Sequence, residues 1–528
     1  MSKSSLQFHR VTYFYETSSE PILENVCVQL THSWTGIIGG NGAGKTTFLK
    51  LACKQLKPVQ GKIITPQNVI YCDQRTDEIP IELSPLLQSS DAQARKLRGQ
   101  LGLQSDWQSR WHTLSHGERK RAQIAIALWQ KPHLLALDEP TNHIDLPTRQ
   151  LLMQSLKQYR GIGLLVSHDQ EMLDQLCRQT LFIDTKKVSQ YPGGYTQAIK
   201  LKDAEYQRMQ RRRSKTRNQL TRLQCERKRR KVEAGKADRK RSKRGLSPKD
   251  SDGRAKHDLA RVSGKDGQAG RQLSQLDGRY KRIQEQLNNT FVAKQTSSRI
   301  TLHGEYARQD RLLRIKPGFL DLGHERTLHF PGLEMAPTDR IGLIGPNGAG
   351  KSTLIQYVIK HKAIPEKRLV YIPQEMDAAQ AHQILCRVRQ MPKTIRGELL
   401  SYVACLGSDA RRLLETEKPS PGELRKLKLA LGMTRTPYLI VMDEPTNHLD
   451  LLSIKALEEA LSTCHCALIL VSHNLHFLRS LVTTIWQLTP DTTDDSFDSV
   501  GLRIQPIESL SHPDSQALFS ANNGRKEQ

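Results

Sequence analysis

The chain carries one set of motifs twice, in the same order and at nearly constant separation, and this duplication constrains its fold more than any other feature. The loop GGNGAGKTT at residues 39–47 returns as GPNGAGKST at residues 345–353, so Lys45 and Lys351 are 306 positions apart. LSHGE returns as PSPGE, LDEPTNHID as MDEPTNHLD, and VSHD as VSHN, each at an offset of 305. Because the spacing is preserved, we expect each copy to fold with the same elements in the same order.

Each copy alternates strand-like and helix-like patterns. The apolar runs TGIIG and RIGLIG lead into the glycine-rich loop, a helical pattern follows, and later apolar runs end in LALDE, VMDE and LVSH. Strands that alternate with helices predict an α/β fold with a mostly parallel sheet covered on both faces. The mainly helical stretches at residues 74–115 and 374–420 are predicted to form a lobe in each copy. We place the two globular domains at residues 5–197 and 299–490.

The segment between the two copies is strongly basic. Residues 201–300 hold 30 Lys and Arg against 11 Asp and Glu, which supplies 19 of the net 26 positive charges. Apolar and other residues spaced by three and four indicate two coiled-coil seams separated by the breaker-rich RGLSPKDSDG. The seam positions are Tyr206, Met209, Arg213, Thr216, Leu220 and Leu223 in the first arm, and Leu273, Leu276, Tyr280, Ile283 and Leu287 in the second.

These seams predict a basic helical hairpin linker at residues 198–298, with its tip at about Arg241 to Arg261. A disordered basic linker is the alternative, because Arg213 and Thr216 weaken the first seam. The last part of the chain, residues 491–528, begins with the polar, acidic run DTTDDSFDS, and we predict a loose tail there.

Composition narrows the function classes. Clustered positive charge and a pI near 9.7 favour a polyanionic partner, with nucleic acid ahead of an anionic lipid surface. The longest apolar runs, GIGLLV and CALILV, are far shorter than the ~18 residues that cross a bilayer, and the N-terminus lacks a signal peptide pattern. We expect a cytoplasmic protein with no membrane partner. Cys464 and Cys466 are expected to be reduced structural thiols, because no second Cys or His pair completes a tetrahedral metal site.

The repeated motifs predict nucleotide chemistry. A GxxxxGK[ST] loop between a strand and a helix cradles phosphates, its Lys reaches the outer phosphates, and its hydroxyl binds Mg²⁺. Residues predicted to bind nucleotide in the two loops are Gly39, Asn41, Gly42, Gly44, Lys45, Thr46 and Thr47, and Gly345, Asn347, Gly348, Gly350, Lys351, Ser352 and Thr353.

Acidic and polar side chains after the later strands complete the predicted site. Mg²⁺ would be bound by Thr46 and Ser352 and, partly through water, by Asp138, Asp443, Gln74 and Gln374. Glu139 and Glu444 are predicted to polarise the attacking water as general bases, with a helix-capping carboxylate as the alternative role. His168 and His473 are predicted to contact the γ-phosphate, the alternative being a buried structural histidine.

Together these motifs resemble the ATP-binding cassette superfamily, with Walker A, a glutamine loop, an LSGGE-like signature, Walker B and a switch histidine present twice. The sequence DEPTNH[IL]D resembles the ABC-F group, soluble tandem cassettes that act on the ribosome, and the resemblance covers about residues 6–490. It implies a monomer whose cassettes pair head to tail and bind two ATP molecules. On that pattern Lys45 faces Ser420 and Gly422, and Lys351 faces Ser115 and Gly117.

The sequence departs from the family pattern at several positions. His116 replaces a signature glycine in LSHGE, and Pro419 and Pro421 flank the serine in PSPGE. Both sites retain the Ser and the Gly-Glu pair, so both are expected to hydrolyse ATP. Tyr15 lies where an adenine-stacking aromatic residue is expected in the first cassette, and Phe319 is the candidate in the second.

The resemblance also implies a function. In ABC-F proteins the linker enters the ribosomal exit site and touches peptidyl-site tRNA and rRNA, ATP closes the cassettes, and hydrolysis releases the factor. We therefore predict a ribosome-binding ATPase that modulates translation or protects the ribosome against antibiotics. The alternative is a DNA-associated ABC ATPase involved in genome maintenance, and a third possibility is the energising subunit of a transporter.

Overall fold

The computed structural model describes most of the chain, and the chain divides into two compact units. The units are Met1–Ala198 with Thr296–Gln528, and Ile199–Gln295; the predicted linker spanned residues 198–298. The described residues are 5–16, 20–142, 144–184, 186–241, 265–289, 304–323, 326–374, 376–406, 408, 413, 420–447, 449–490 and 499–511.

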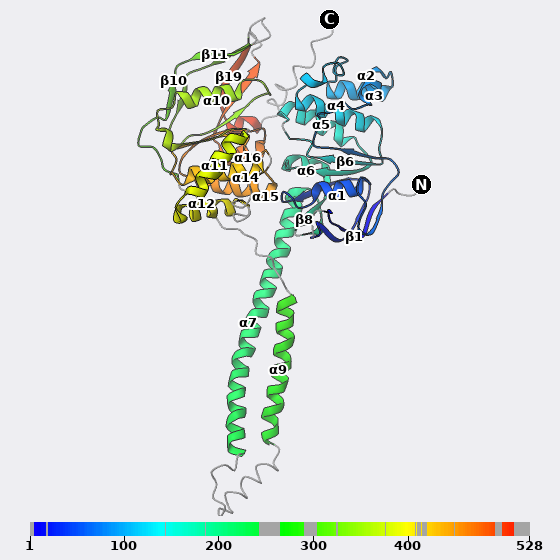
Figure 1. The fold of residues 1–528 in the computed structure, drawn as a ribbon, viewed down its shortest axis with the longest axis vertical. Coiled ribbons are helices and arrows are strands. Elements are labelled where there is room, and N and C mark those ends of the chain that lie inside the picture. Colours follow the sequence, from blue (N-terminus) through cyan, green and yellow to red (C-terminus); the bar gives the residue numbers. More distant parts are fainter. Residues whose placement is uncertain are drawn as a thin grey trace, which may run out of the picture. The chain divides into compact units, whose positions relative to one another are not determined.

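The first cassette contains a small antiparallel sheet and a larger, mostly parallel one (Figure 1). The small sheet has the order β2-β1-β4, formed by Leu23–Leu30, Leu6–Tyr13 and Gln60–Ile64. The large sheet has the order β5-β6-β7-β3-β8-β9, formed by Val69–Cys72, Leu134–Asp138, Ile162–Val166, Trp34–Gly39, Cys177–Asp184 and Lys187–Pro192. Only β9 of this sheet is antiparallel to its neighbour.

Helices of the first cassette follow its parallel strands, as the alternating pattern predicts. They are α1 (Lys45–Ala52), α2 (Leu83–Gln88), α3 (Ala92–Leu101), α4 (His116–Trp129), α5 (Leu146–Lys157) and α6 (Gln170–Leu176), with a 3₁₀ turn at Trp111–Thr113. Between the two sheets, Phe8 of β1 stacks on Phe48 of α1 with ring centroids 4.6 Å apart. Burial of such apolar side chains fixes α1, and with it the glycine-rich loop, against the strands.

The second cassette repeats this topology. Its parallel strands have the order β15-β16-β17-β14-β18, which matches β5-β6-β7-β3-β8 strand for strand. They are Leu369–Ile372, Leu439–Asp443, Ala467–Val471, Arg340–Ile344 and Thr484–Pro490. The helices are α10 (Lys351–Lys360), α11 (Ala378–Gln390), α12 (Lys393–Cys405), α14 (Pro421–Met433), α15 (Leu451–Ser462) and α16 (Leu475–Leu481), with 3₁₀ turns at Glu366–Arg368 and Ile507–Ser511. The predicted duplicated α/β fold is confirmed.

The rest of the second cassette differs from the first. β11 (Gly318–Gly323) and β12 (Arg326–Phe330) extend its large sheet instead of forming a separate three-stranded one, and β10 (Leu313–Ile315) pairs with β13 (Leu333–Met335). The extension is possible because β19 (Ser499–Pro506) pairs with β18 on one side and with β12 on the other.

The predicted loose tail is therefore wrong for part of its length. Residues 499–506 form β19, and Val500 and Leu502 are buried there, because apolar side chains at alternate positions face the core. Residues 491–498 and 512–528 lie outside the described part of the chain.

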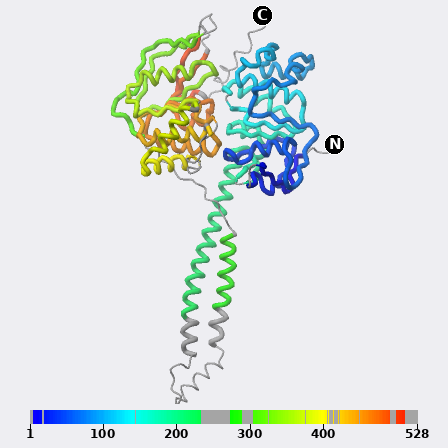
Figure 2. Tube along the Cα trace, viewed as in Figure 1, coloured from blue at the N-terminus to red at the C-terminus, as the bar shows by residue number. Residues whose placement is uncertain are grey.

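The second unit is a pair of long helices, α7 (Tyr195–Arg241) and α9 (Lys265–Asn289), which Figure 2 shows running side by side. Arg227 of α7 contributes to their contact: it pairs with Asp277 of α9 and lies 5.2 Å from the centroid of the Tyr280 ring. The 47 residues of α7 would extend about 70 Å at 1.5 Å per residue. Where the structure describes this segment it is helical, which contradicts a disordered linker; the predicted tip, Arg241 to Arg261, lies almost wholly outside those residues.

The coiled-coil seam is partly as predicted. All five predicted positions of α9 are shielded from solvent, and Leu276 is buried. In α7, however, Met209 and Arg213 are exposed, and the shielded positions continue instead through Arg227 and Arg230. In the second half of the α7 seam, the aliphatic parts of arginine side chains and the contact of Arg227 with the Tyr280 ring thus take the place of apolar residues.

Candidate ATP-hydrolysis site

The two glycine-rich loops have matching backbone geometry. Gly44 and Gly350, the residues preceding α1 and α10, have φ of +98° and +86°, a left-handed conformation that favours glycine. A Cβ atom on Gly44 would lie 2.6 Å from Ile22, and one on Gly350 would lie 2.6 Å from Leu322. Only glycine therefore allows each loop to turn into its helix so that the helix N-terminus faces the loop.

The Walker A side chains lie as the motif requires. The Lys45 ammonium donates to the carbonyls of Gly39 at 2.9 Å and Gly40 at 3.4 Å, and the Thr46 hydroxyl donates to Asp138 at 2.8 Å. Burial lowers the pKa of Lys45 and raises that of Asp138. A hydroxyl and a carboxylate side by side are hard oxygen ligands of the kind that Mg²⁺ prefers.

The second cassette repeats these contacts. Lys351 donates to Gly345 at 2.8 Å and Pro346 at 3.0 Å, and Ser352 donates to Asp443 at 2.9 Å. Burial lowers the pKa of Lys351 and raises that of Asp443 here as well.

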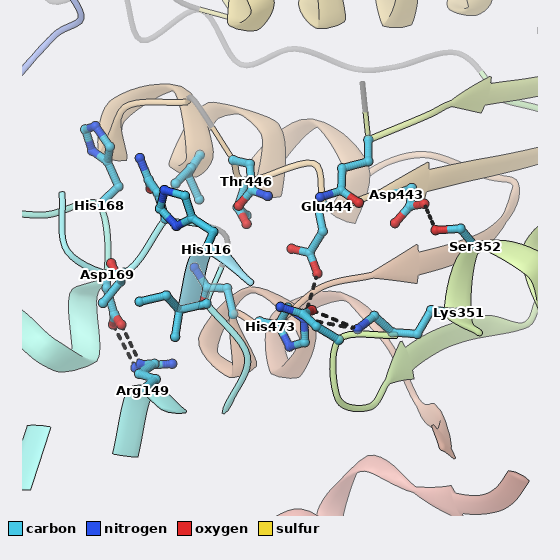
Figure 3. Close-up of a pocket in the computed structure, with 18 of the residues that line it drawn as sticks. His116, Arg149, His168, Asp169, Lys351, Ser352, Asp443, Glu444, Thr446 and His473 are labelled. Carbon is cyan, nitrogen blue, oxygen red and sulfur yellow. Dashed lines mark hydrogen bonds and ion pairs between the residues drawn. The ribbon is translucent and has the colours of Figure 1, made fainter. Parts of the chain in front are cut away.

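A cavity of 330 Å³ brings residues of both cassettes together (Figure 3). The second cassette contributes the predicted residues Asn347, Gly348, Lys351, Ser352, Gln374, Asp443, Glu444 and His473. The first contributes His168 and His116, the signature residue between Ser115 and Gly117. Walker A of one cassette and the signature of the other thus line one cavity, as expected for head-to-tail pairing. Gln74 is exposed and does not line it, and the pairing of Lys45 with Ser420 and Gly422 stays a prediction.

Glu139 is held as an ionised group. Its carboxylate lies 2.9 Å from Nε2 of His168 and accepts a hydrogen bond from Asn142 at 2.5 Å. Burial opposes ionisation, but the hydrogen bond and charge of His168, with Lys45 and Asn142, outweigh it and lower the pKa of Glu139 to about 2. Its φ of +48° is strained for a residue other than glycine, which is a frequent property of functional positions.

Glu444 has the same backbone conformation but a different environment. Its φ is +47°, its side chain is buried, and burial raises its pKa to about 7 despite the nearby Lys351. His473 lies 3.5 Å from Glu444 and 3.2 Å from the Lys351 ammonium, and burial together with that ammonium lowers the pKa of His473 to about 3. Glu139 is thus bound to its histidine more closely than Glu444 is.

This difference predicts unequal pH dependence at the two sites. With Glu139→Gln, turnover depends on Glu444 and should fall to half near pH 7 as the pH is lowered, because a general base acts only when deprotonated. With Glu444→Gln, turnover depends on Glu139 and should change less than about twofold between about pH 6 and 8. Rate–pH profiles of the two single variants test this, and superimposable profiles would contradict it.

The signature helices begin normally despite the unusual sequences. Ser115 and Ser420 each cap a helix, accepting from the backbone N–H of Glu118 or Glu423 while that glutamate accepts from the serine N–H. Pro421 occupies the first turn of α14, where a missing N–H costs nothing. Pro419 lies outside the described residues.

The two candidate adenine-contacting residues lie differently. The Tyr15 hydroxyl is 3.1 Å from that of Thr47, so its ring lies beside the start of α1. Phe319, in contrast, is 67% exposed and packs against His329 at 6.1 Å, whereas its neighbour Leu320 lines a hollow with Thr353. Adjacent strand residues point to opposite faces, so Leu320, not Phe319, faces the hollow beside Thr353 of α10.

Two aspartates that were not among the predicted site residues connect the cassettes. Oδ2 of Asp450 accepts from the N–H of Asn41 at 3.1 Å, and Oδ2 of Asp145 accepts from the N–H of Asn347 at 3.5 Å. Each Oδ1 caps its own helix, α15 or α5. The signal was available, because both aspartates end the repeated DEPTNH[IL]D motif.

The remaining motif, CxC, is compact. The Cys464 and Cys466 sulfurs are 2.9 Å apart and both side chains are buried. Where the structure describes the chain, no group of three or more His, Cys, Asp or Glu side chains is placed to hold a metal ion.

Comparison with known families agrees with this geometry. The family described as ABC transporter matches residues 23–142 and 329–447. The chain is 28% identical over 492 residues to the ribosome protection protein VmlR of Bacillus subtilis, covering 88% of this chain and 83% of that protein. It is 29% identical over 542 residues to the tylosin resistance ATP-binding protein TlrC of Streptomyces fradiae, covering 89% and 95%.

Solved structures show the same fold. RNase-L inhibitor superposes with a TM-score of 0.59 at 17% identity, over 94% of this chain and 90% of that one. The archaeal ribosome recycling factor aABCE1 gives 0.59 at 16% identity, over 93% and 89%. Among the described residues, no helix is both long and apolar enough to cross a membrane. With two complete sets of nucleotide motifs on matching sheets, two matches to the ABC transporter family model and relatives aligned along most of its length, the chain is a tandem ATP-binding cassette ATPase, an ATP hydrolase similar to proteins of the ABC-F group.

Proposed function

We propose that this ATPase binds the ribosome through its basic hairpin and either modulates translation or protects the ribosome from antibiotics. The observation that carries the proposal is the hairpin itself, a pair of long helices with the chain's excess positive charge concentrated on it. Exposed arginines of α7 include Arg211, Arg212, Arg217 and Arg222. Such density neutralises phosphates without reading sequence, and folded RNA is a partner of matching charge.

The relatives support this choice over other polyanions. One is described as a ribosome protection protein and another as a resistance protein for tylosin. The finer proposal is that the hairpin contacts peptidyl-site tRNA and rRNA, and that the protein acts in the cytoplasm as a monomer whose cassettes pair with each other.

The cassettes would supply the energy. Lys45 and Lys351 would bind the outer phosphates, Ser115 and Ser420 would contact the ATP of the opposite cassette, and Tyr15 would stack on adenine. Thr46, Ser352, Asp138, Asp443, Gln74 and Gln374 would hold Mg²⁺, which neutralises charge on the phosphates when bound. Glu139 and Glu444 would each take a proton from the attacking water, and His168 and His473 would contact the γ-phosphate.

Co-sedimentation with purified ribosomes tests the proposal. The double variant Glu139→Gln, Glu444→Gln should pellet with ribosomes in ATP and remain bound, whereas the unaltered chain should be released as it hydrolyses ATP. The same samples are offered DNA at equal phosphate concentration and vesicles of anionic lipid. Binding to DNA or vesicles but not to ribosomes would reject the proposal, and recovery with DNA would favour the genome-maintenance alternative.

A further inference from the structure

A buried basic side chain follows each signature motif at the same position. Lys120 in α4 and Arg425 in α14 are 305 residues apart and each lies five residues after its signature serine. Their relative exposures are 0% and 5%. Burying a cation is costly unless its hydrogen bonds are made, so the contacts of each side chain indicate what it is for.

Both side chains hold the backbone of the glutamine loop. Nζ of Lys120 donates to the carbonyl of Asp73 at 2.6 Å and lies 3.5 Å from that of Gln74. A terminal nitrogen of Arg425 donates to the carbonyl of Gln374. In each cassette, therefore, the signature helix is fastened to the loop that carries the predicted Mg²⁺ and water ligand.

Arg425 also contacts a second loop of its cassette. Its other terminal nitrogen donates to the carbonyls of Glu444 at 3.0 Å and Asn447 at 2.7 Å. The guanidinium fork thus joins the loop after β15 to the loop after β16, two neighbouring parallel strands. Among the described residues, Lys120 makes no hydrogen bond to Glu139, and its single ammonium donates to the glutamine loop.

One of these additional contacts is with Glu444, a residue whose backbone is strained. Glu444 has a left-handed backbone with φ of +47°, and the direction of its side chain depends on holding that conformation. Glu139 has the same φ, but its carboxylate is fixed directly by His168 at 2.9 Å and Asn142 at 2.5 Å. Glu444 lies 3.5 Å from His473, so its position relies more on its backbone.

We propose that Arg425 is a positioning residue for the second site, where it fixes Gln374 and Glu444 relative to each other through their backbone carbonyls. Where the structure describes the first cassette, Lys120 holds the glutamine loop and makes no equivalent link to Glu139. The inference rests on the proposed roles of Gln374 and Glu444 in hydrolysis and does not involve the ribosome.

The test measures ATP turnover by the full chain in two parent variants without ribosomes. Glu139→Gln leaves catalysis to Glu444, and Glu444→Gln leaves it to Glu139. Adding Arg425→Met should lower kcat about 10- to 100-fold in the first parent, because small misplacement of catalytic groups has effects of that order. In the second parent kcat should change less than about threefold, and the affinity for a fluorescent ATP analogue should stay within about threefold in both.

A further variant separates positioning from general stability. Arg425→Lys keeps the positive charge but has a single ammonium in place of the guanidinium fork, so it should restore only part of the rate that is lost with Arg425→Met.

The matched control is Arg121→Met in the same first parent. Arg121 lies on the signature helix of the first cassette, donates to the Leu101 carbonyl at 2.8 Å and stacks over Trp107, but does not contact the glutamine loop. Its removal should leave kcat within about twofold.

Three results would each overturn the inference. They are an equal loss of kcat in both parents, an equal loss of kcat with Arg121→Met, and no loss of kcat with Arg425→Met. Each parent should hydrolyse ATP faster than the double variant Glu139→Gln, Glu444→Gln. If a parent does not, the remaining glutamate is not the base, and the inference fails together with that assignment. Loss of ribosome binding with these rates intact would reject only the proposed function.

Discussion

Replacing Glu139 and Glu444 together by Gln should lower ATP turnover by about 10² to 10⁴-fold, the contribution typical of a general base. Both residues directly follow buried strands, β6 and β16, and both have a left-handed backbone near the Walker A lysine of their own cassette. Glutamine keeps the shape of the side chain and one acceptor oxygen but cannot accept the proton of the attacking water. ATP affinity should therefore stay within about threefold, which a fluorescent ATP analogue measures alongside phosphate release.

The matched control for this variant is Glu78→Gln with Glu82→Gln. Both are exposed carboxylates of the first cassette and make the same change in net charge. Their replacement should leave turnover within about twofold. If the control lowers turnover as much as the double variant, or if the double variant still hydrolyses ATP at the normal rate, neither glutamate is the base.

Neutralising four exposed arginines of α7 should weaken ribosome binding on the order of 10²-fold or more near physiological salt. The substitutions are Arg211→Gln, Arg212→Gln, Arg217→Gln and Arg222→Gln, all at solvent-facing helical positions where Gln is a good helix former. Each phosphate contact contributes about 0.7 to 0.9 to the slope of log affinity against log salt. The slope should thus decrease by about three, measured by sedimentation over a range of KCl concentrations.

The same number of charges removed from a cassette provides the comparison. Lys57→Gln, Lys62→Gln, Arg95→Gln and Lys96→Gln alter exposed positions of the first cassette. This variant should retain most of the affinity and most of the salt slope. Equal weakening by the two sets would show that net charge, not the hairpin, determines binding.

The topology and the Walker A geometry could be predicted from the sequence because the duplicated motifs determine them. Because the two copies carry the same motifs at the same spacing, both were expected to have the same topology. The strand order β5-β6-β7-β3-β8 of the first cassette is repeated as β15-β16-β17-β14-β18 in the second. Walker A geometry follows from the same constraint, because Gly44 and Gly350 occupy backbone conformations that other residues rarely adopt. Motif residues could therefore be assigned to elements with no structure in hand.

Features set by tertiary contacts were not predictable in the same way. β19 follows an acidic run that suggested a tail, although Val500, Leu502 and Ile504 alternate as a strand requires. In α7 the seam continues through Arg227, which belongs there only because Asp277 and Tyr280 lie opposite. Likewise, identical DEP motifs gave no sign that Glu139 and Glu444 differ, since the difference comes from how closely His168 and His473 approach them.

Asp145 and Asp450 each make two separate contacts, and these contacts determine what would change if the cassettes separated. In each carboxylate one oxygen closes the end of its own helix while the other reaches the opposite glycine-rich loop. Parting the cassettes would expose only the second oxygen to water and leave the helix end intact. The starts of α5 and α15 would then be capped in the same way whether or not the cassettes are in contact.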